Sequence, residues 1–136
     1  MKIENLSSDT QDFLLCLYKH KVKYLLVGGE AVIYYGYPRL TGDIDFFYER
    51  STKNSNHLFG ALKEFWEEDV PGIHAAADLE ESGAIFQFGV PPNRIDLINQ
   101  IDGVTFNQGW DSKEKTTLEY SDRVIDIYII GLDQLI

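Results

Sequence analysis

Three aspartates occupy positions from which β-strands could present carboxylates to a metal ion. Asp43 and Asp45 flank Ile44 at the start of one strand-like segment, and Asp96 lies inside a later one, Arg94–Ile98. Residues two apart in a strand point to the same face, so the carboxylates of Asp43 and Asp45 would stand side by side. Such a pair repels itself without a counter-ion, and carboxylate oxygens are ligands for divalent cations such as Mg²⁺. The spacing therefore favours a divalent-cation site.

Each aspartate also has an ordinary structural explanation. The pair Asp43 and Asp45 can be a solvated strand end, and Asp96 can form a structural ion pair with Arg94 or another base. A calcium loop of the EF-hand type is excluded, because its central glycine and terminal glutamate are absent. The aspartates alone leave the metal and structural alternatives open.

Two glycines end the first predicted strand. Gly28 and Gly29 follow the apolar run Lys23–Val27 and lead into a helix-like segment. Unpaired backbone N–H groups at a helix N-terminus bind phosphate, because the helix dipole favours an anion. A tight turn without a ligand is the commoner meaning of two glycines. The pattern lacks the Gly-Lys-Ser/Thr of a Walker loop and the third glycine of a dinucleotide fingerprint.

The elements that would position these residues alternate between helical and strand-like patterns. Helical spacing covers Ser8–His20, Ala31–Tyr35 and Asn54–Glu68, and strand-like runs cover Lys23–Val27, Asp43–Glu49, Ala84–Phe88, Arg94–Ile98 and Arg123–Ile130, with a further short strand over Gly103–Phe106. This order predicts an α+β fold, a mixed sheet with flanking helices, in a single domain over residues 1–136. Residues 131–136 have the pattern of a helix that has only begun, so either the natural chain continues or this piece packs firmly on the domain.

Composition narrows the class of protein. Lys and Arg number 12 and Asp and Glu number 22, so the net charge is −10 and recognition of nucleic acid through a basic surface is disfavoured. We expect no membrane span and no signal peptide, because no apolar run approaches 18 residues and the N-terminus lacks an apolar core. Cys16 is the only cysteine, which excludes an internal disulfide and fits a cytoplasmic protein.

Taken together, the glycine pair and the three aspartates form a specific pattern. Gly28-Gly29 is followed after thirteen residues by Asp43-x-Asp45, and Asp96 lies in a later apolar strand. This pattern resembles the nucleotidyltransferase superfamily that shares its catalytic palm with DNA polymerase β.

The resemblance extends over about residues 23–136. The segments Val27–Asp45 and Pro92–Ile98 are similar in particular to the small bacterial nucleotidyltransferases related to the AbiEii abortive-infection toxins. Two departures stand out. Many members of the superfamily carry serine where Gly29 stands, and relatives usually continue beyond Ile136 with basic and acidic residues that help hold nucleotide or substrate.

The resemblance implies a role for each motif residue. Asp43 and Asp45 would bind two Mg²⁺ ions, with Mn²⁺ able to substitute, and Asp96 would complete one metal site and help activate the acceptor hydroxyl. Gly28 and Gly29 would lie under the triphosphate of a nucleotide such as ATP.

Two residues just ahead of the carboxylates are further candidates for nucleotide binding. The guanidinium of Arg39 and the hydroxyl of Thr41 could reach triphosphate oxygens. An exposed loop arginine and a strand-capping threonine are equally compatible with these positions.

Two functions of different class follow. The first is an enzyme, a Mg²⁺-dependent nucleotidyltransferase that moves a nucleoside monophosphate from a nucleoside triphosphate to an RNA, protein or small-molecule acceptor, in a toxin–antitoxin or phage-defence system. The second is a non-catalytic antitoxin or adaptor that keeps the fold and acts by binding a protein partner. The three aspartates favour the enzyme, and the small size of the chain favours the adaptor.

Overall fold

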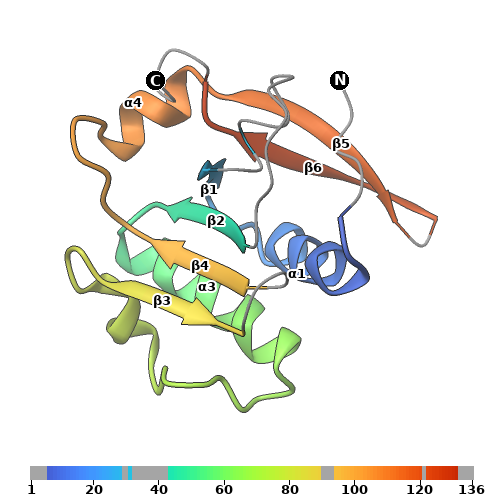
Figure 1. Ribbon diagram of the computed structural model, residues 1–136. Helices are drawn as coiled ribbons and strands as arrows, with labels where there is room; N and C mark the ends of the chain where they lie inside the picture. The colour runs from blue at the N-terminus through green and yellow to red at the C-terminus, as the bar shows by residue number, and fades with distance from the viewer. Residues whose placement is uncertain (1–5, 29–30, 32–42, 90–93, 121, 132–136) are drawn as a thin grey trace.

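One mixed β-sheet organises the chain (Figure 1). The structure is a computed structural model that describes residues 6–28, 31, 43–89, 94–120 and 122–131. In chain order its elements are α1 (Ser8–Lys19), β1 (Tyr24–Val27), β2 (Asp43–Tyr48), α3 (Thr52–Phe65), the 3₁₀ helix η1 (Ala76–Glu80), β3 (Ile85–Phe88), β4 (Arg94–Ile98), α4 (Phe106–Asp111), β5 (Glu114–Tyr120) and β6 (Arg123–Ile129).

The strand directions bring several strand ends to one edge of the sheet. The order is β3-β4-β2-β1-β6-β5, with β1 antiparallel to β2 and parallel to β6, and with β2 parallel to β4. The carboxyl end of β1 therefore meets the amino ends of β2 and β4. Gly28, Asp43 and Arg94, which stand at these three ends, all belong to that edge.

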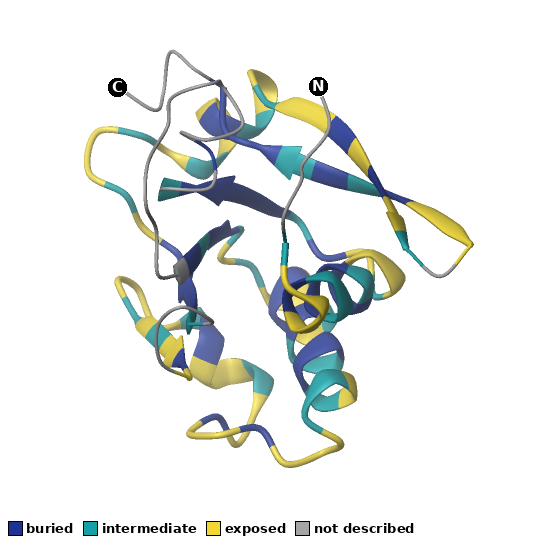
Figure 2. Cartoon of the chain, turned by 45° about the vertical axis from the view of Figure 1, so that its right-hand side comes forward, coloured by how far each residue is buried: buried dark blue, intermediate teal, exposed yellow. Residues whose placement is uncertain are grey.

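Helices α1 and α3 cover one face of the sheet (Figure 1). The ring of Phe13 on α1 lies 5.3 Å from that of Phe46 on β2, and Trp66, which caps α3, lies 4.5 Å from Phe88 on β3. The helix faces toward the sheet are buried, whereas their outer faces are partly or fully exposed (Figure 2). The main hydrophobic core therefore lies between this helical layer and the sheet.

The short helix α4 covers part of the opposite face. The ring of Phe106 lies 5.3 Å from that of Phe47 on β2, and Trp110 lies 5.0 Å from Tyr128 on β6. A Cβ at Gly109 would come within 2.7 Å of Leu25 on β1, so glycine allows α4 to approach the sheet closely there. The register pairs Leu25 with Phe47, so these two neighbouring side chains form the part of the sheet surface on which α4 packs.

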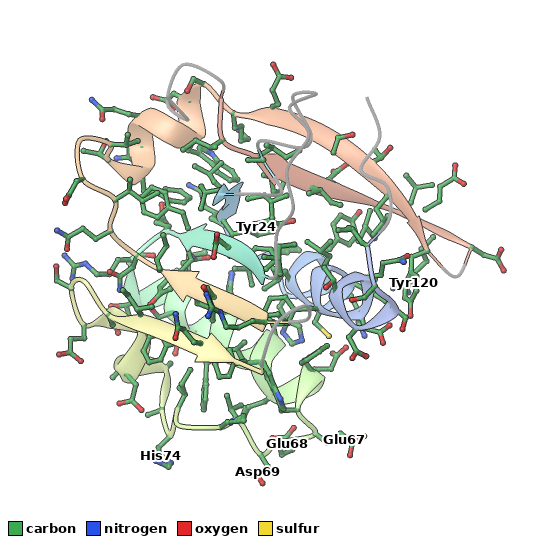
Figure 3. The ribbon with its side chains drawn as sticks, in the orientation of Figure 1. Tyr24, Glu67, Glu68, Asp69, His74 and Tyr120 are labelled. Atoms are coloured by element: carbon green, nitrogen blue, oxygen red, sulfur yellow. The ribbon has the colours of Figure 1, made fainter. Side chains whose placement is uncertain are left out.

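A polar contact ties the β5–β6 hairpin to the first helix. The hydroxyl of Tyr120, at the end of β5, donates to the carboxylate of Asp12 on α1 (Figure 3). Among the described residues, no helix has the length and apolar character needed to cross a bilayer.

The α+β prediction is confirmed, and five of the predicted strands and the first and third predicted helices lie where expected, within a few residues. The strand predicted over Gly103–Phe106 is wrong. Thr105 caps α4 instead, accepting from the Gln108 N–H while the Gln108 side chain accepts from the Thr105 N–H. Strand β5 was missed, because its exposed side chains hide its alternation. Of the predicted Ala31–Tyr35 helix, the structure describes only Ala31. Of the segment 131–136, it describes only Gly131.

Asn54 fastens α3 to the two strands beside it. This buried side chain accepts from the Lys23 N–H at 2.7 Å and donates to the carbonyls of Lys23 and Glu49 at 2.9 and 2.8 Å. One amide thus satisfies three backbone groups at the ends of β1 and β2. Buried backbone groups that lose such partners are costly.

We predict that Asn54→Ala lowers the free energy of unfolding by about 2–3 kcal/mol, because the partly buried Lys23 N–H and Glu49 carbonyl lose their hydrogen bonds to the Asn54 amide. Asn54→Asp should cost at least as much, since a carboxylate would then face two carbonyl oxygens. Chemical denaturation measures both, with the exposed Asn56→Ala on the same helix as the control. Equal stabilities of the Asn54→Ala and Asn56→Ala variants would contradict the assignment.

Glu64 joins α3 to the end of α1. Its carboxylate accepts from Lys19 Nζ at 2.7 Å and contacts His20 Nε2 at 3.1 Å, and the Cys16 thiol lies 3.6 Å away. The hydrogen bond from Lys19, followed by that from His20, lowers the pKa of Glu64 to about 2. Burial, followed by the charge of Glu64, raises the pKa of Cys16 to about 12, so this thiol is an unreactive packing group.

This contact predicts a pH-dependent contribution to stability. The folded pKa of Glu64 lies below its ordinary 4.5, so its stabilisation is complete above pH 4.5 and is lost as pH falls toward 2. The side chain is 40% exposed, so solvent screening limits the contribution to about 0.5–1 kcal/mol. We expect Glu64→Gln to have a lower free energy of unfolding than the parent at pH 7. Denaturation at a series of pH values should show this difference shrinking as the pH falls from 4.5 to 2. Glu119→Gln, at an exposed position of β5, is the control for the loss of one carboxylate.

Candidate active site

Asp45 and Asp96 stand side by side on one face of the sheet. Strands β2 and β4 are parallel neighbours, and their register pairs Asp45 directly with Asp96. Directly paired residues of adjacent strands share a face, so this register sets the two carboxylates beside each other. The face is the one that α4 partly covers, because Asp45 lies two residues before Phe47 on β2.

The third aspartate lies on the same strand pair. The backbone of Asp43 is paired with Arg94, two positions before the Asp45–Asp96 pair. The Asp43 side chain lies outside the described part of the structure. The predicted role of Asp43 as a metal ligand therefore stays a prediction.

The glycine at the end of β1 is in direct contact with the Asp45 carboxylate. Gly28 has φ +69°, and a Cβ built on it would lie 2.1 Å from Asp45 Oδ2. A side chain at this position would meet both backbone strain and the carboxylate itself. Gly28 thus allows Asp45 to lie against the backbone at the carboxyl end of β1.

Asp96 is held by the arginine at the start of its own strand. Arg94 Nε lies 3.0 Å from Asp96 Oδ1, and Arg94 Nη2 donates to Asp96 Oδ2 at 3.1 Å. Only 9% of the Asp96 side chain is exposed, against 31% of the Arg94 side chain. The ion pair that the sequence left open as the structural alternative is therefore present.

The other predicted nucleotide-binding residues are not placed. Gly29, Arg39 and Thr41 lie outside the described residues, so their predicted contacts with a triphosphate stay predictions. They belong to the segment of chain between Gly28 and Asp43, which both lie at the edge that carries the site.

Comparison with known proteins gives one informative match. No protein-family model matches the chain, and no curated protein matches it. The structure is similar to the crystal structure of TM1012 from Thermotoga maritima, a provisionally assigned nucleotidyltransferase, with a TM-score of 0.56 and 13% sequence identity. The match covers 93% of this chain and 77% of the other. The chain has a nucleotidyltransferase fold.

The donor set of this nucleotidyltransferase fold suits a hard divalent cation. Asp45 and Asp96 offer carboxylate oxygens from two paired strands, the ligand type that Mg²⁺ and Mn²⁺ prefer. Within the described residues, no group of three acidic, histidine or cysteine side chains is gathered closely enough to hold a metal. A complete site would need a ligand such as Asp43, whose side chain is not among them.

Gln87 is a residue of this region that the sequence did not single out. It is paired with Asp96 from the β3 side, so Asp96 stands between Asp45 and Gln87 across the sheet. Gln87 also borders a pocket of about 230 Å³ beside Trp66 and Phe88, which lies toward the helical face of the sheet and is not lined by Asp45 or Asp96. The signal was present, since a lone amide interrupts the aromatic strand Ile85–Phe88.

The contact between Gly28 and Asp45 yields a prediction for stability. Gly28→Ala should lower the free energy of unfolding by about 1–2 kcal/mol from positive φ alone, and further because Asp45 must move. In an Asp45→Ala background the second part should vanish, so a double-mutant cycle should show a coupling of about 1 kcal/mol.

Gly72→Ala is the matched control for this cycle. Gly72 has φ +75°, and a Cβ there would meet nothing within 4 Å. Its substitution should cost the backbone part only, and by the same amount with or without Asp45. Purely additive effects of Gly28→Ala and Asp45→Ala in urea denaturation would refute the contact.

Proposed function

We propose that this protein is a Mg²⁺-dependent nucleotidyltransferase, which moves a nucleoside monophosphate from a nucleoside triphosphate to an acceptor. One observation carries the proposal. Asp45 and Asp96 are paired on one face of the sheet, and Asp45 rests against Gly28 at the carboxyl end of β1. The similarity in fold to TM1012 supports the same class of reaction.

The residues divide the chemistry between them in this proposal. Asp45 and Asp96, with Asp43, would hold Mg²⁺, which when bound supplies neutralisation of the charge that develops on the phosphoryl group. Asp96 would orient the acceptor hydroxyl toward the nucleotide. Backbone N–H groups after Gly28 would bind the triphosphate, because an anion is favoured where backbone donors are unpaired.

The finer placement rests on the motif alone. We propose that the chain belongs with the small AbiEii-related nucleotidyltransferases, on the similarity of Val27–Asp45 and Pro92–Ile98 to that group. A role in a toxin–antitoxin or phage-defence system follows from this placement. The acceptor would then be an RNA, a protein or a small molecule.

A non-catalytic adaptor is the second candidate, and one contact favours it. The Arg94 guanidinium engages both oxygens of Asp96, as expected of a site that has exchanged a metal for a structural ion pair. Nucleotide binding separates the two functions. With Mg²⁺ or Mn²⁺, a nucleoside triphosphate should raise the melting temperature of an enzyme by mass action. A flat response to all four nucleotides would favour the adaptor.

We predict that Asp45→Asn and Asp96→Asn each reduce nucleotidyl transfer more than about 100-fold, because each removes a carboxylate ligand of the metal. The assay incubates the protein with each labelled nucleoside triphosphate, Mg²⁺ and total cell extract, and then identifies the labelled acceptor. Circular dichroism should show that both variants are folded. The exposed Asp102→Asn is the control and should retain transfer. Full activity of Asp45→Asn would refute the proposed role.

A further inference from the structure

The Arg94–Asp96 pair joins two side chains on one strand at the proposed metal site. Nε and Nη2 of Arg94 face Oδ1 and Oδ2 of Asp96, at 3.0 and 3.1 Å. This contact combines an ion pair at Nε with a charge-assisted hydrogen bond from Nη2. It fixes the orientation of the Asp96 carboxylate as well as offsetting its charge.

The location of Asp96 explains why a cation is needed beside it. Its side chain is more than nine-tenths buried, and the carboxylate of Asp45 occupies the paired position on the next strand. A buried charge next to a like charge is costly unless a cation offsets it. Arg94 supplies such a cation.

The same contact opposes a metal ion. Both Asp96 oxygens face the guanidinium, so a divalent cation on Asp96 would lie within a few ångströms of a positive charge in a partly dehydrated site. Resting on the proposed function, we infer that Arg94 is the resident counter-ion of the site, which a divalent cation displaces when it binds. Arg94 thereby sets the metal affinity, as a positioning residue for Asp96.

Displacement makes a prediction that a purely structural ion pair does not make. If the metal and Arg94 perform the same task, removing Arg94 should destabilise the metal-free protein, and the metal should restore much of that loss. If Arg94 has only a structural role, its removal should destabilise the protein equally with and without metal. The decisive quantity is therefore the difference in metal response between variants.

The experiment measures melting temperature and Mn²⁺ binding for the full chain, without nucleotide. Arg94→Gln should melt several degrees below the parent without Mn²⁺, should regain most of that loss at saturating Mn²⁺, and should bind Mn²⁺ at least about tenfold more tightly by titration calorimetry. Arg123→Gln, at an exposed position of β6, makes the same change in net charge and should bind Mn²⁺ like the parent.

Two further variants keep the test decisive. Arg94→Gln combined with Asp96→Asn removes both charges, so it should fold without the Mn²⁺ rescue. Arg94→Lys keeps the cation without the two-point contact, so its Mn²⁺ affinity should lie between those of the parent and Arg94→Gln. If Arg94→Gln does not fold alone, refolding it with and without Mn²⁺ gives the same comparison.

The outcomes distinguish this inference from the proposed function. Parent and Arg94→Gln proteins that respond equally to Mn²⁺ would overturn the counter-ion role and leave the nucleotidyltransferase proposal intact. Mn²⁺ that binds neither protein would overturn both. If Mn²⁺ restores the melting temperature of Arg94→Gln and Arg94→Lys but not that of the double variant, Mn²⁺ and the side chain at position 94 compete for Asp96.

Discussion

The parallel register between β2 and β4 is the constraint on which the candidate site depends. It sets Asp45 against Asp96, so two carboxylates that are 51 residues apart in the chain share one face of a sheet. A shift of one residue would turn Asp96 toward the helical layer, where Phe46 and Leu97 now lie. The hydrophobic pattern that places Leu97 in the core therefore also places Asp96 on the opposite face.

The strand ends around this pair explain why the site lies at one edge. Strand β1 runs toward Gly28, whereas β2 and β4 start beside it, so a glycine turn and the carboxylates converge without any long side chain. The positive φ of Gly28 and the packing of Asp45 on its Cα belong to the same arrangement. A side chain at position 28 would push the Asp45 carboxylate away from the glycine turn, so the turn and the carboxylates would no longer lie together.

Much of this fold could be predicted from the sequence, because strong local patterns mark the strands that matter. The apolar runs around Asp45 and Asp96 identify two strands, and alternation places Asp43 and Asp45 on one face. The strand order that makes β2 and β4 neighbours is a long-range property, so the resemblance to a known fold had to supply it. The contact of Gly28 with Asp45 was equally beyond local pattern.

Other errors show which signals were present and which were not. The Thr105 to Gln108 spacing is a capping box, so α4 was predictable in place of a strand. Strand β5 has a weaker signature, since only Thr116 and Leu118 within it are buried. Its pairing with β6 stabilises it, and pairing cannot be deduced from one strand alone.

Charge connects the site to the rest of the molecule. A chain with a net charge of −10 repels an anionic nucleotide at long range, so the attraction must be local. Arg94 is one local cation, and it is already engaged by Asp96. In the proposed enzyme, the charge that brings a triphosphate to this face would come from the divalent cation that accompanies the nucleotide and from Arg39, which lies outside the described residues. Dependence on the metal is then a consequence of the protein's electrostatics as well as of its chemistry.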